Sequence, residues 1–252
     1  MATIGIFDSG SGGLSVYRKI VQLLPSERYV YFADNAHCPY GEKSAEYIQD
    51  RARIITDILL GLGADIIVVA CNTATAAAIA TLREEYPEVT FVGMEPAVKP
   101  AALGTKTGVI GVLATAGTLK GSKYLKTKGL YEDDVRIVEH VGEGFVELVE
   151  SGILDGPEAY ETVKASLQPL LDAGADRIVL GCTHYPFLRP VIEAIAGPGI
   201  QVIDPAPAVA RPTVRMLEKD CLPLDEGPFS IDLYFSGEPD SLKRILALIN
   251  NQ

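Results

Sequence analysis

Two stretches of this chain follow one pattern, and that pattern constrains the fold more than any other feature. The first reads GADIIVVACNT (residues 63–73) and the second GADRIVLGCTHY (residues 174–185). In each, the cysteine comes eight positions after the first glycine (71 − 63 and 182 − 174). An apolar run of this length, rich in Ile and Val, predicts a strand buried on both faces of a parallel sheet. The repetition predicts a duplicated α/β unit.

Each copy places a cysteine, Cys71 or Cys182, just past the carboxyl end of its strand. In open α/β sheets, ligands bind at that edge. A single buried cysteine mostly behaves as a small hydrophobic residue. Two cysteines at matching positions of a duplicated unit instead predict two thiols that face each other across one site.

Composition excludes several classes of protein. The 252 residues are 48% hydrophobic, which allows a large core, and the chain is long enough for two domains. The net charge is −11 and no run of Lys or Arg occurs, so a nucleic-acid partner is not expected. No window reaches the ~18 apolar residues of a membrane span, and no signal peptide is recognisable. We therefore expect a cytoplasmic protein without a membrane partner.

The four cysteines are Cys38, Cys71, Cys182 and Cys221. In a chain without a secretory signal, free thiols are expected rather than disulfides. The sequence has no CxxC motif and no dense His/Cys cluster, so no structural zinc site is expected either.

The first half of the chain predicts alternating strands and helices. Strands are expected at residues 3–7, 28–33, 63–70 and 89–92, and helices at 14–24, 44–62 and 74–86. The loop DSGSGG (residues 8–13) follows the first strand, and its glycines let backbone N–H groups approach a ligand. It is not a P-loop, because no Lys-Ser/Thr closes it. A tight turn in which Asp8 or Ser9 caps the helix is the alternative.

The second half repeats this plan. Strands are expected at residues 107–113, 135–138, 174–180 and 200–203. Helices are expected at 144–150, 157–173 and 208–219, and a further helix follows Pro186 and ends near residue 196. Prolines near positions 96–100 and 204–207 mark two crossings between the halves, and we expect the helix at 208–219 to return to the first half. Residues 230–235 alternate as in an edge strand, and a helix is expected at 242–249.

These elements predict an α/β protein of two pseudo-symmetric βαβ-type domains with mainly parallel sheets. The first domain takes residues 1–96 plus 208–252, and the second takes residues 97–207. The active site is expected in the cleft between them.

Three kinds of chemistry suit two facing thiols. They could form a redox disulfide, although that usually uses CxxC and needs Cα atoms within about 7 Å. One cysteine could be a nucleophile with His184 as its base, which leaves the second cysteine idle. Both thiols could instead act as bases on opposite faces of one carbon, which inverts a stereocentre without a cofactor.

Four motifs make the resemblance specific. The residues FDSG (7–10), DNAHCPYG (34–41), ACNTA (70–74) and GCTHYP (181–186) together resemble the glutamate racemase family, among the cofactor-independent aspartate/glutamate racemases. The resemblance covers essentially the whole chain. Two loops depart from the family pattern: Thr and Arg are commoner after Asp34, and Ser often follows the aspartate that precedes Pro205.

The resemblance implies an isomerase that interconverts L-glutamate and D-glutamate for peptidoglycan, with no cofactor and no metal. A homodimer is compatible with the family, whose members form monomers and several kinds of dimer. Aspartate racemase is the nearest rival. A protein of another class, a two-lobed small-anion-binding module with packed cysteines, is the alternative.

The resemblance also assigns catalytic roles. Cys71 is expected to deprotonate D-glutamate and Cys182 to deprotonate L-glutamate. Asp8 assists the first cysteine and His184 lies beside the second. Glu150 is the assisting glutamate, with Glu147 on the same helical face as the competing assignment.

Further positions match residues that hold the substrate's carboxylates and ammonium. They are Asp8, Ser9, Tyr40, Gly41, Asn72, Thr73, Thr118, Thr183 and His184. Cys38 is interpreted as a bystander near the site, and Cys221 as structural or on the surface.

Two effects are expected to act on the thiol of Cys71. A helix N-terminus lowers the pKa of a thiol and favours the thiolate. The like charge of Asp8 raises that pKa. We therefore expect Asp8 to act through proton transfer or by pairing with the substrate ammonium. A carbanion also needs a dry site, so the lobes should close on the substrate.

Overall fold

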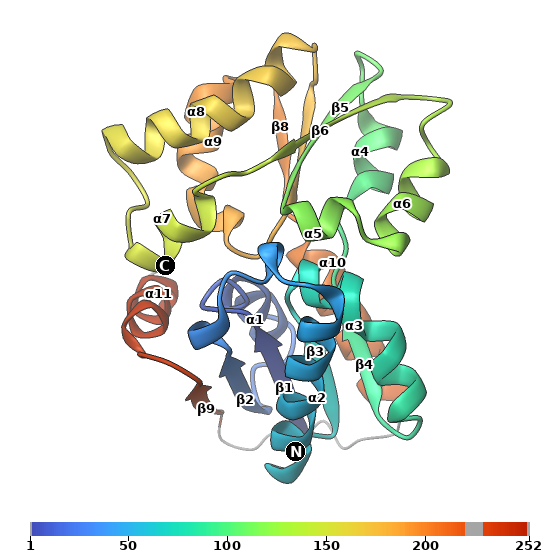
Figure 1. Ribbon diagram of the computed structural model, residues 1–252, viewed down its shortest axis with the longest axis vertical. Coiled ribbons are helices and arrows are strands. Elements are labelled where there is room, and N and C mark those ends of the chain that lie inside the picture. Colours follow the sequence, from blue (N-terminus) through green and yellow to red (C-terminus); the bar gives the residue numbers. More distant parts are fainter. Residues whose placement is uncertain (1, 220–228, 251–252) are drawn as a thin grey trace.

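The computed structural model describes residues 2–219 and 229–250, which form two parallel β-sheets flanked by helices (Figure 1). Every strand pairing is parallel, so the expected α/β class is confirmed. The strands are β1 (Thr3–Asp8), β2 (Arg28–Ala33), β3 (Ile66–Val69), β4 (Thr90–Gly93), β5 (Val109–Ala114), β6 (Arg136–Val141), β7 (Arg177–Gly181), β8 (Gln201–Ile203) and β9 (Ser230–Phe235).

Most helices fall close to the ranges that the sequence predicts, whereas α4, α5 and α6 had no predicted range. They are α1 (Leu14–Val21), α2 (Ala45–Gly61), α3 (Asn72–Glu85), α4 (Val98–Gly104), α5 (Ala116–Leu119), α6 (Ser122–Gly129), α7 (Phe145–Ser151), α8 (Pro157–Asp172), α9 (Arg189–Ala196), α10 (Ala206–Lys219) and α11 (Asp240–Asn250). Short 3-10 helices lie at η1 (Asn35–His37), η2 (Tyr40–Glu42) and η3 (Tyr185–Leu188).

The duplication extends to the order of the strands. The first sheet runs β4-β3-β1-β2-β9 and the second runs β6-β5-β7-β8. Read from the other side, the second sheet is β8-β7-β5-β6, which matches β4-β3-β1-β2 strand for strand. The strand before Cys71 therefore corresponds in position to the strand before Cys182.

The last part of the described chain returns to the first sheet. Strand β9 pairs with β2 at the edge, as its alternating sequence predicts. Helix α10 packs on α1 and β4, and α11 lies between α1 and α7 (Figure 1). The exact domain boundaries at 96/97 and 207/208 stay a prediction.

Burial explains why the central strands are mostly apolar. In β1, Ile4 and Ile6 belong to the large apolar cluster on one face of the first sheet, whereas Phe7 belongs to a cluster on the opposite face. All four residues of β3 are buried. Helices cover both faces of such parallel sheets, and this leaves the strand ends as the place for polar chemistry.

The first crossing contains a short helix for which the sequence analysis gave no range. Residues Val98–Gly104 form α4, with Pro100 in its first turn, where a missing N–H costs nothing. Among the described residues, no helix is both long and apolar enough to span a membrane.

Candidate active site

Polar side chains gather where the carboxyl ends of the two sheets face each other. Strand order reverses between β1 and β3 in the first sheet and between β5 and β7 in the second. In the first sheet, Asp8 is the last residue of β1 and Cys71 comes just after β3. In the second sheet, Thr115 comes directly after β5 and Cys182 directly after β7. Such reversal points are where open α/β sheets bind ligands. In this molecule the reversal points of the two sheets lie next to each other, since Thr183 after β7 donates a hydrogen bond to Asp8 at the end of β1.

The thiol of Cys71 sits at the start of α3. Its Sγ accepts the backbone N–H of Ala74 at 3.4 Å and lies 3.8 Å from the Oγ of Ser9. Burial, followed by the negative charge of Asp8, raises the pKa of this thiol above its ordinary value. Both expected effects are present: the Ala74 N–H at the helix N-terminus lowers the pKa of the thiol and Asp8 raises it, and the net pKa is raised because desolvation and Asp8 outweigh the Ala74 N–H.

The second thiol belongs to a chain of three side chains. The Sγ of Cys182 lies 3.7 Å from Nδ1 of His184, and Nε2 of the same ring lies 2.6 Å from Oε1 of Glu150. Burial lowers the pKa of His184, but hydrogen bonds with Cys182 and Glu150 raise it well above its usual range. These contacts favour the protonated form of the ring.

Glu150, rather than Glu147, makes the contact with the histidine. Its Oε1 also accepts the backbone N–H of Ser11 at 2.8 Å and the Ser11 hydroxyl at 3.0 Å. Burial opposes its charge, yet these bonds and the His184 charge lower the pKa of Glu150 to about 2. Glu147 instead lines a cavity beside Tyr185. This geometry favours Glu150 as the assisting carboxylate.

Asp8 is fully buried between the two halves. Its Oδ2 accepts the N–H groups of Gly10 and Gly13 at 3.2 and 3.0 Å, and its Oδ1 accepts the Thr183 hydroxyl at 3.2 Å. Burial raises its pKa, and the nearby His184 charge opposes that rise. A carboxyl in this position can accept or release a proton, or pair with an ammonium.

The glycines of the first loop allow this close approach. A Cβ on Gly10 would lie 2.3 Å from Oε1 of Glu150, and a Cβ on Gly12 would lie 2.4 Å from Nδ1 of His184. Any larger residue would push the Glu150–His184 pair away. The glycine-rich loop is thus a packing surface for the other half of the molecule, in addition to being a turn.

Hydroxyl and amide groups line the side of Cys71 that faces the second half. Thr73 Oγ1 lies 2.8 Å from Thr115 Oγ1 and 3.4 Å from Thr118 Oγ1, so this cluster crosses between the halves. Both polar side-chain atoms of buried Asn72 lack a partner among the described residues. Buried amide groups are normally paired, so Asn72 is equipped to bind a polar ligand.

Tyr40 and Gly41 lie on the loop that leads to α2. The Tyr40 hydroxyl donates to Asp34, whose carboxylate also receives two hydrogen bonds from Arg51, at 2.8 and 2.9 Å. Tyr40 is thus already engaged by the protein. Gly41 approaches Thr115, because a Cβ added to it would lie 3.1 Å from that residue's Cβ.

The structure adds residues that sequence reasoning missed. Ser11 and Thr115 join the site, and Arg51 and Asp34 hold Tyr40. The polar loop after β5, equivalent to the DSG loop after β1, was the available signal for Thr115. Arg51 gave no signal, because it looks like any charge on an amphipathic helix. Cys221 lies outside the described residues.

The two thiols lie in a closed interior. Cys71 is 5% exposed and Cys182 is 6% exposed. Two cavities open beside other residues of the site, and neither is lined by Cys71 or Cys182: one of about 450 Å³ borders Gly41, Thr115 and Tyr185, and another of about 360 Å³ borders Cys38 and Glu150. This low exposure supports the expectation that the halves move apart to admit a substrate.

Two α/β units that each bring a thiol to one shared site suit proton transfer at two faces of a carbon. Residues 4–213 match the family model for Asp/Glu/Hydantoin racemase. The chain therefore belongs to the Asp/Glu/Hydantoin racemase family.

Within that family, the relatives and solved structures most similar to this chain include several glutamate racemases. The chain is 48% identical to the glutamate racemase of Ectopseudomonas mendocina, with 98% of this chain and 94% of the relative covered. It is 47% identical to that of Pseudomonas aeruginosa PAO1 over the same shares. The glutamate racemase RacE1 of Bacillus anthracis superposes with a TM-score of 0.88 at 31% identity, over 100% of this chain and 94% of the other. Escherichia coli glutamate racemase, solved with L-glutamate, gives 0.85 at 33%, over 99% and 94%.

Proposed function

We propose that this protein interconverts L-glutamate and D-glutamate by proton transfer between two cysteines, and so supplies D-glutamate for peptidoglycan. The observation that carries the proposal is the pair of buried thiols, Cys71 and Cys182, at equivalent ends of a duplicated unit. The glutamate racemases of 46–48% identity support glutamate as the substrate. The protein is an isomerase of the amino-acid racemase kind.

The reaction needs one base on each side of the α-carbon. Cys71 removes the α-proton of D-glutamate while Cys182 donates a proton to the opposite face, and L-glutamate reacts in the reverse sense. His184, held by Glu150, lies 3.7 Å from the Cys182 sulfur, and its protonated form would stabilise a thiolate there. Because burial raises the pKa of Cys71, that thiol rests protonated and needs help to ionise.

Asp8 and the substrate ammonium supply that help. An ammonium beside Asp8 offsets the negative charge that disfavours the Cys71 thiolate. A carboxyl whose own pKa is raised can also take a proton from the thiol. Donors aimed at the substrate carboxylates stabilise the developing carbanion. They are Ser9, Asn72, Thr73, Thr118 and Thr183, with Tyr40 and Gly41 acting through their backbone N–H groups, because the Tyr40 hydroxyl already donates to Asp34.

Location and assembly belong to the same proposal. We place the reaction in the cytoplasm, and we treat the two halves (residues 1–96 plus 208–252, and 97–207) as domains that close on the substrate. A homodimer is the proposed assembly, which light scattering coupled to size-exclusion chromatography would test.

One incubation tests the reaction. Purified protein with L-glutamate in D₂O, without added pyridoxal phosphate, should lose optical activity while deuterium appears at Cα. Circular dichroism follows the first change and proton NMR the second. L-aspartate in a parallel tube should react far more slowly, and Cys71→Ala should abolish racemisation. Absence of exchange with either amino acid would contradict the proposal.

A further inference from the structure

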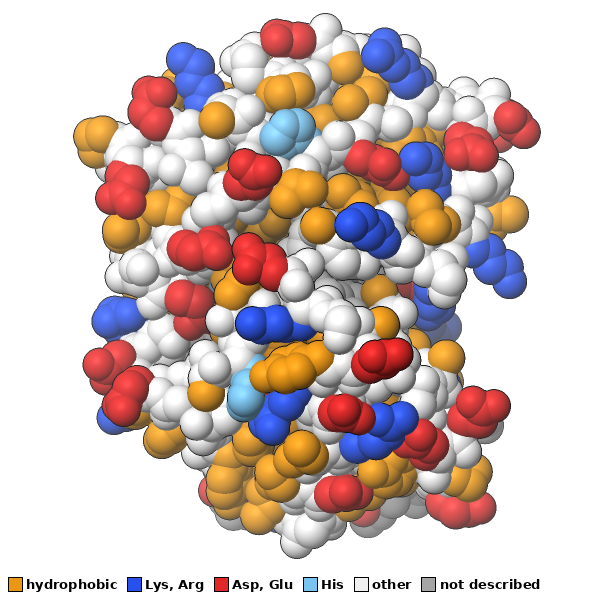
Figure 2. All heavy atoms as spheres, in the orientation of Figure 1, with side chains coloured by type: hydrophobic (Ala, Val, Ile, Leu, Met, Phe, Trp, Pro, Cys, Tyr) orange, Lys and Arg blue, Asp and Glu red, His pale blue; other side chains and the backbone are white. Residues whose placement is uncertain are grey.

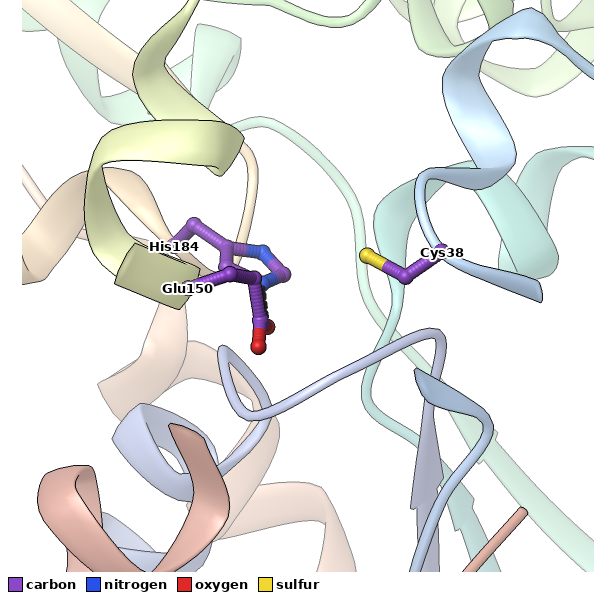
Figure 3. Close-up of side chains that lie close together, drawn as sticks. All are labelled: Cys38, Glu150 and His184. Atoms are coloured by element: carbon purple, nitrogen blue, oxygen red, sulfur yellow. Dashed lines mark hydrogen bonds and ion pairs between the residues drawn. The ribbon is translucent and has the colours of Figure 1, made fainter. Parts of the chain in front are cut away.

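The fold brings three metal-binding side chain types together beside the active site. Cys38, Glu150 and His184 come from positions far apart in the sequence, yet their ligand atoms all lie within 4.8 Å of one another. In Figure 3 the sulfur of Cys38 points from the η1–η2 loop toward the imidazole and the Glu150 carboxylate. Sequence spacing could not reveal this cluster.

The chemistry of the three groups matches a thiophilic divalent cation. A thiolate, an imidazole nitrogen and a carboxylate oxygen are the ligands that Zn²⁺ takes at about 2.0–2.3 Å. The Glu150 Oε1 and the His184 Nε2 are 2.6 Å apart, so a small separation of the two would admit a shared cation. The cation would displace the thiol proton and the Nε2 proton to solvent.

The approach to this cluster is negatively charged. The cavity of about 360 Å³ that borders Cys38 and Glu150 also presents the carboxylates of Glu147, Glu238 and Asp240. Arg244 lines the same cavity and donates to the Glu150 carbonyl oxygen at 2.8 Å. Acidic side chains are also prominent on the left of Figure 2, at the height where the halves meet. Clefts of one charge sign raise the local concentration of counter-ions.

We propose that Cys38, Glu150 and His184 form an inhibitory binding site for Zn²⁺ or a similar thiophilic cation. A cation there would take His184 and Glu150 away from Cys182 and would obstruct the closed site. The proposal goes beyond the racemase reaction and gives Cys38, otherwise a bystander, a regulatory role.

Direct binding tests the site independently of activity. In an inactive Cys71→Ser, Cys182→Ser variant, added Co²⁺ should produce a thiolate-to-metal charge-transfer band from Cys38. Adding Cys38→Ser should remove that band, whereas adding Cys221→Ser should leave it. Persistence of the band without Cys38, or its absence from the start, would overturn the proposal.

Inhibition provides the second test, and this part rests on the proposed function. Cys38→Ser should keep its basal rate within about twofold and need at least ~10-fold more Zn²⁺ for half-inhibition, as loss of one ligand implies. Cys221→Ser is the matched thiol control and should behave as the wild type. Equal zinc sensitivity in Cys38→Ser would assign inhibition to the catalytic thiols instead. A protein that binds Co²⁺ as described but fails to racemise would contradict the function and leave the site intact.

Discussion

His184 and Glu150 form the buried ion pair of the site. Its charges lie in a buried setting, since His184 is 1% exposed and the Glu150 side chain is 20% exposed. Each stabilises the charged form of the other, which moves their pKa values in opposite directions. The pair therefore links folding to pH.

Replacing Glu150 by Gln should destabilise the protein most above about pH 4.5. Because folding lowers the Glu150 pKa from 4.5 to about 2, its stabilisation is complete above the unfolded value and is lost as pH falls toward 2. The difference in unfolding free energy from the wild type should be on the order of 2 kcal/mol at pH 6. Urea titrations at pH 6 and pH 3, with exposed Glu161→Gln as the control, measure it. A difference of the same size at both pH values would contradict this account.

Asp8→Asn should preserve the fold and impair catalysis. An asparagine oxygen can still accept the N–H groups of Gly10 and Gly13, but it cannot hold a proton or neutralise an ammonium. We expect kcat from D-glutamate to fall at least ~100-fold, in the range of general acid–base effects. Coupled assays in both directions measure it, and unchanged turnover in both would exclude a role for Asp8.

At the scale of the element, the loop between β1 and α1 should tolerate little change. Gly12→Ala places a methyl 2.4 Å from the His184 ring, which must then shift. We expect kcat to fall about 100-fold, as small misplacements of catalytic groups do. Gly61→Ala in α2 meets no atom within 4 Å and should leave kcat unchanged. Steady-state kinetics on both variants measure kcat. Equal kcat values for the two variants would show that the loop accommodates the added methyl group without displacing His184.

The positions of most strands and helices could be predicted from the sequence, but the side-chain contacts between distant elements could not. Periodicity placed β2 and α8 almost to the residue, because continuous apolar runs and 3.6-residue spacing are local signals. The duplicated cysteine pattern located both thiols. The contact between Glu150 and Ser11 spans 139 positions, and nothing local encodes it. The net direction of the Cys71 pKa shift could not be read from the sequence, because burial depth is a property of the assembled molecule.

At the scale of the whole molecule, the closed site predicts that the halves must open. Gly41 and Thr115 face each other across the halves: a Cβ added to Gly41 would lie 3.1 Å from the Cβ of Thr115, so a disulfide, with its Cβ atoms about 3.5–4.5 Å apart, needs only a small outward shift. The double variant Gly41→Cys, Thr115→Cys should therefore lock when oxidised. We expect its activity to drop at least ~10-fold on oxidation and to recover with dithiothreitol.

Two controls define that experiment. Thr115→Cys alone and the wild type, treated identically, report oxidation of the catalytic thiols. Mass spectrometry establishes that the crosslink has formed. A crosslinked protein with undiminished turnover would mean that substrate reaches Cys71 and Cys182 without opening.

The return of β9 to the first sheet bears on how the chain is made. Arg28 of β2 and Asp232 of β9 form an ion pair across 204 positions of sequence. A ribosome adds about 5–20 residues per second, so β2 waits roughly 10–40 s for this neighbour. During that time its backbone edge is free to pair with another nascent chain. A protein with this topology carries an unpaired strand edge in its first sheet until residues 230–235 have been synthesised.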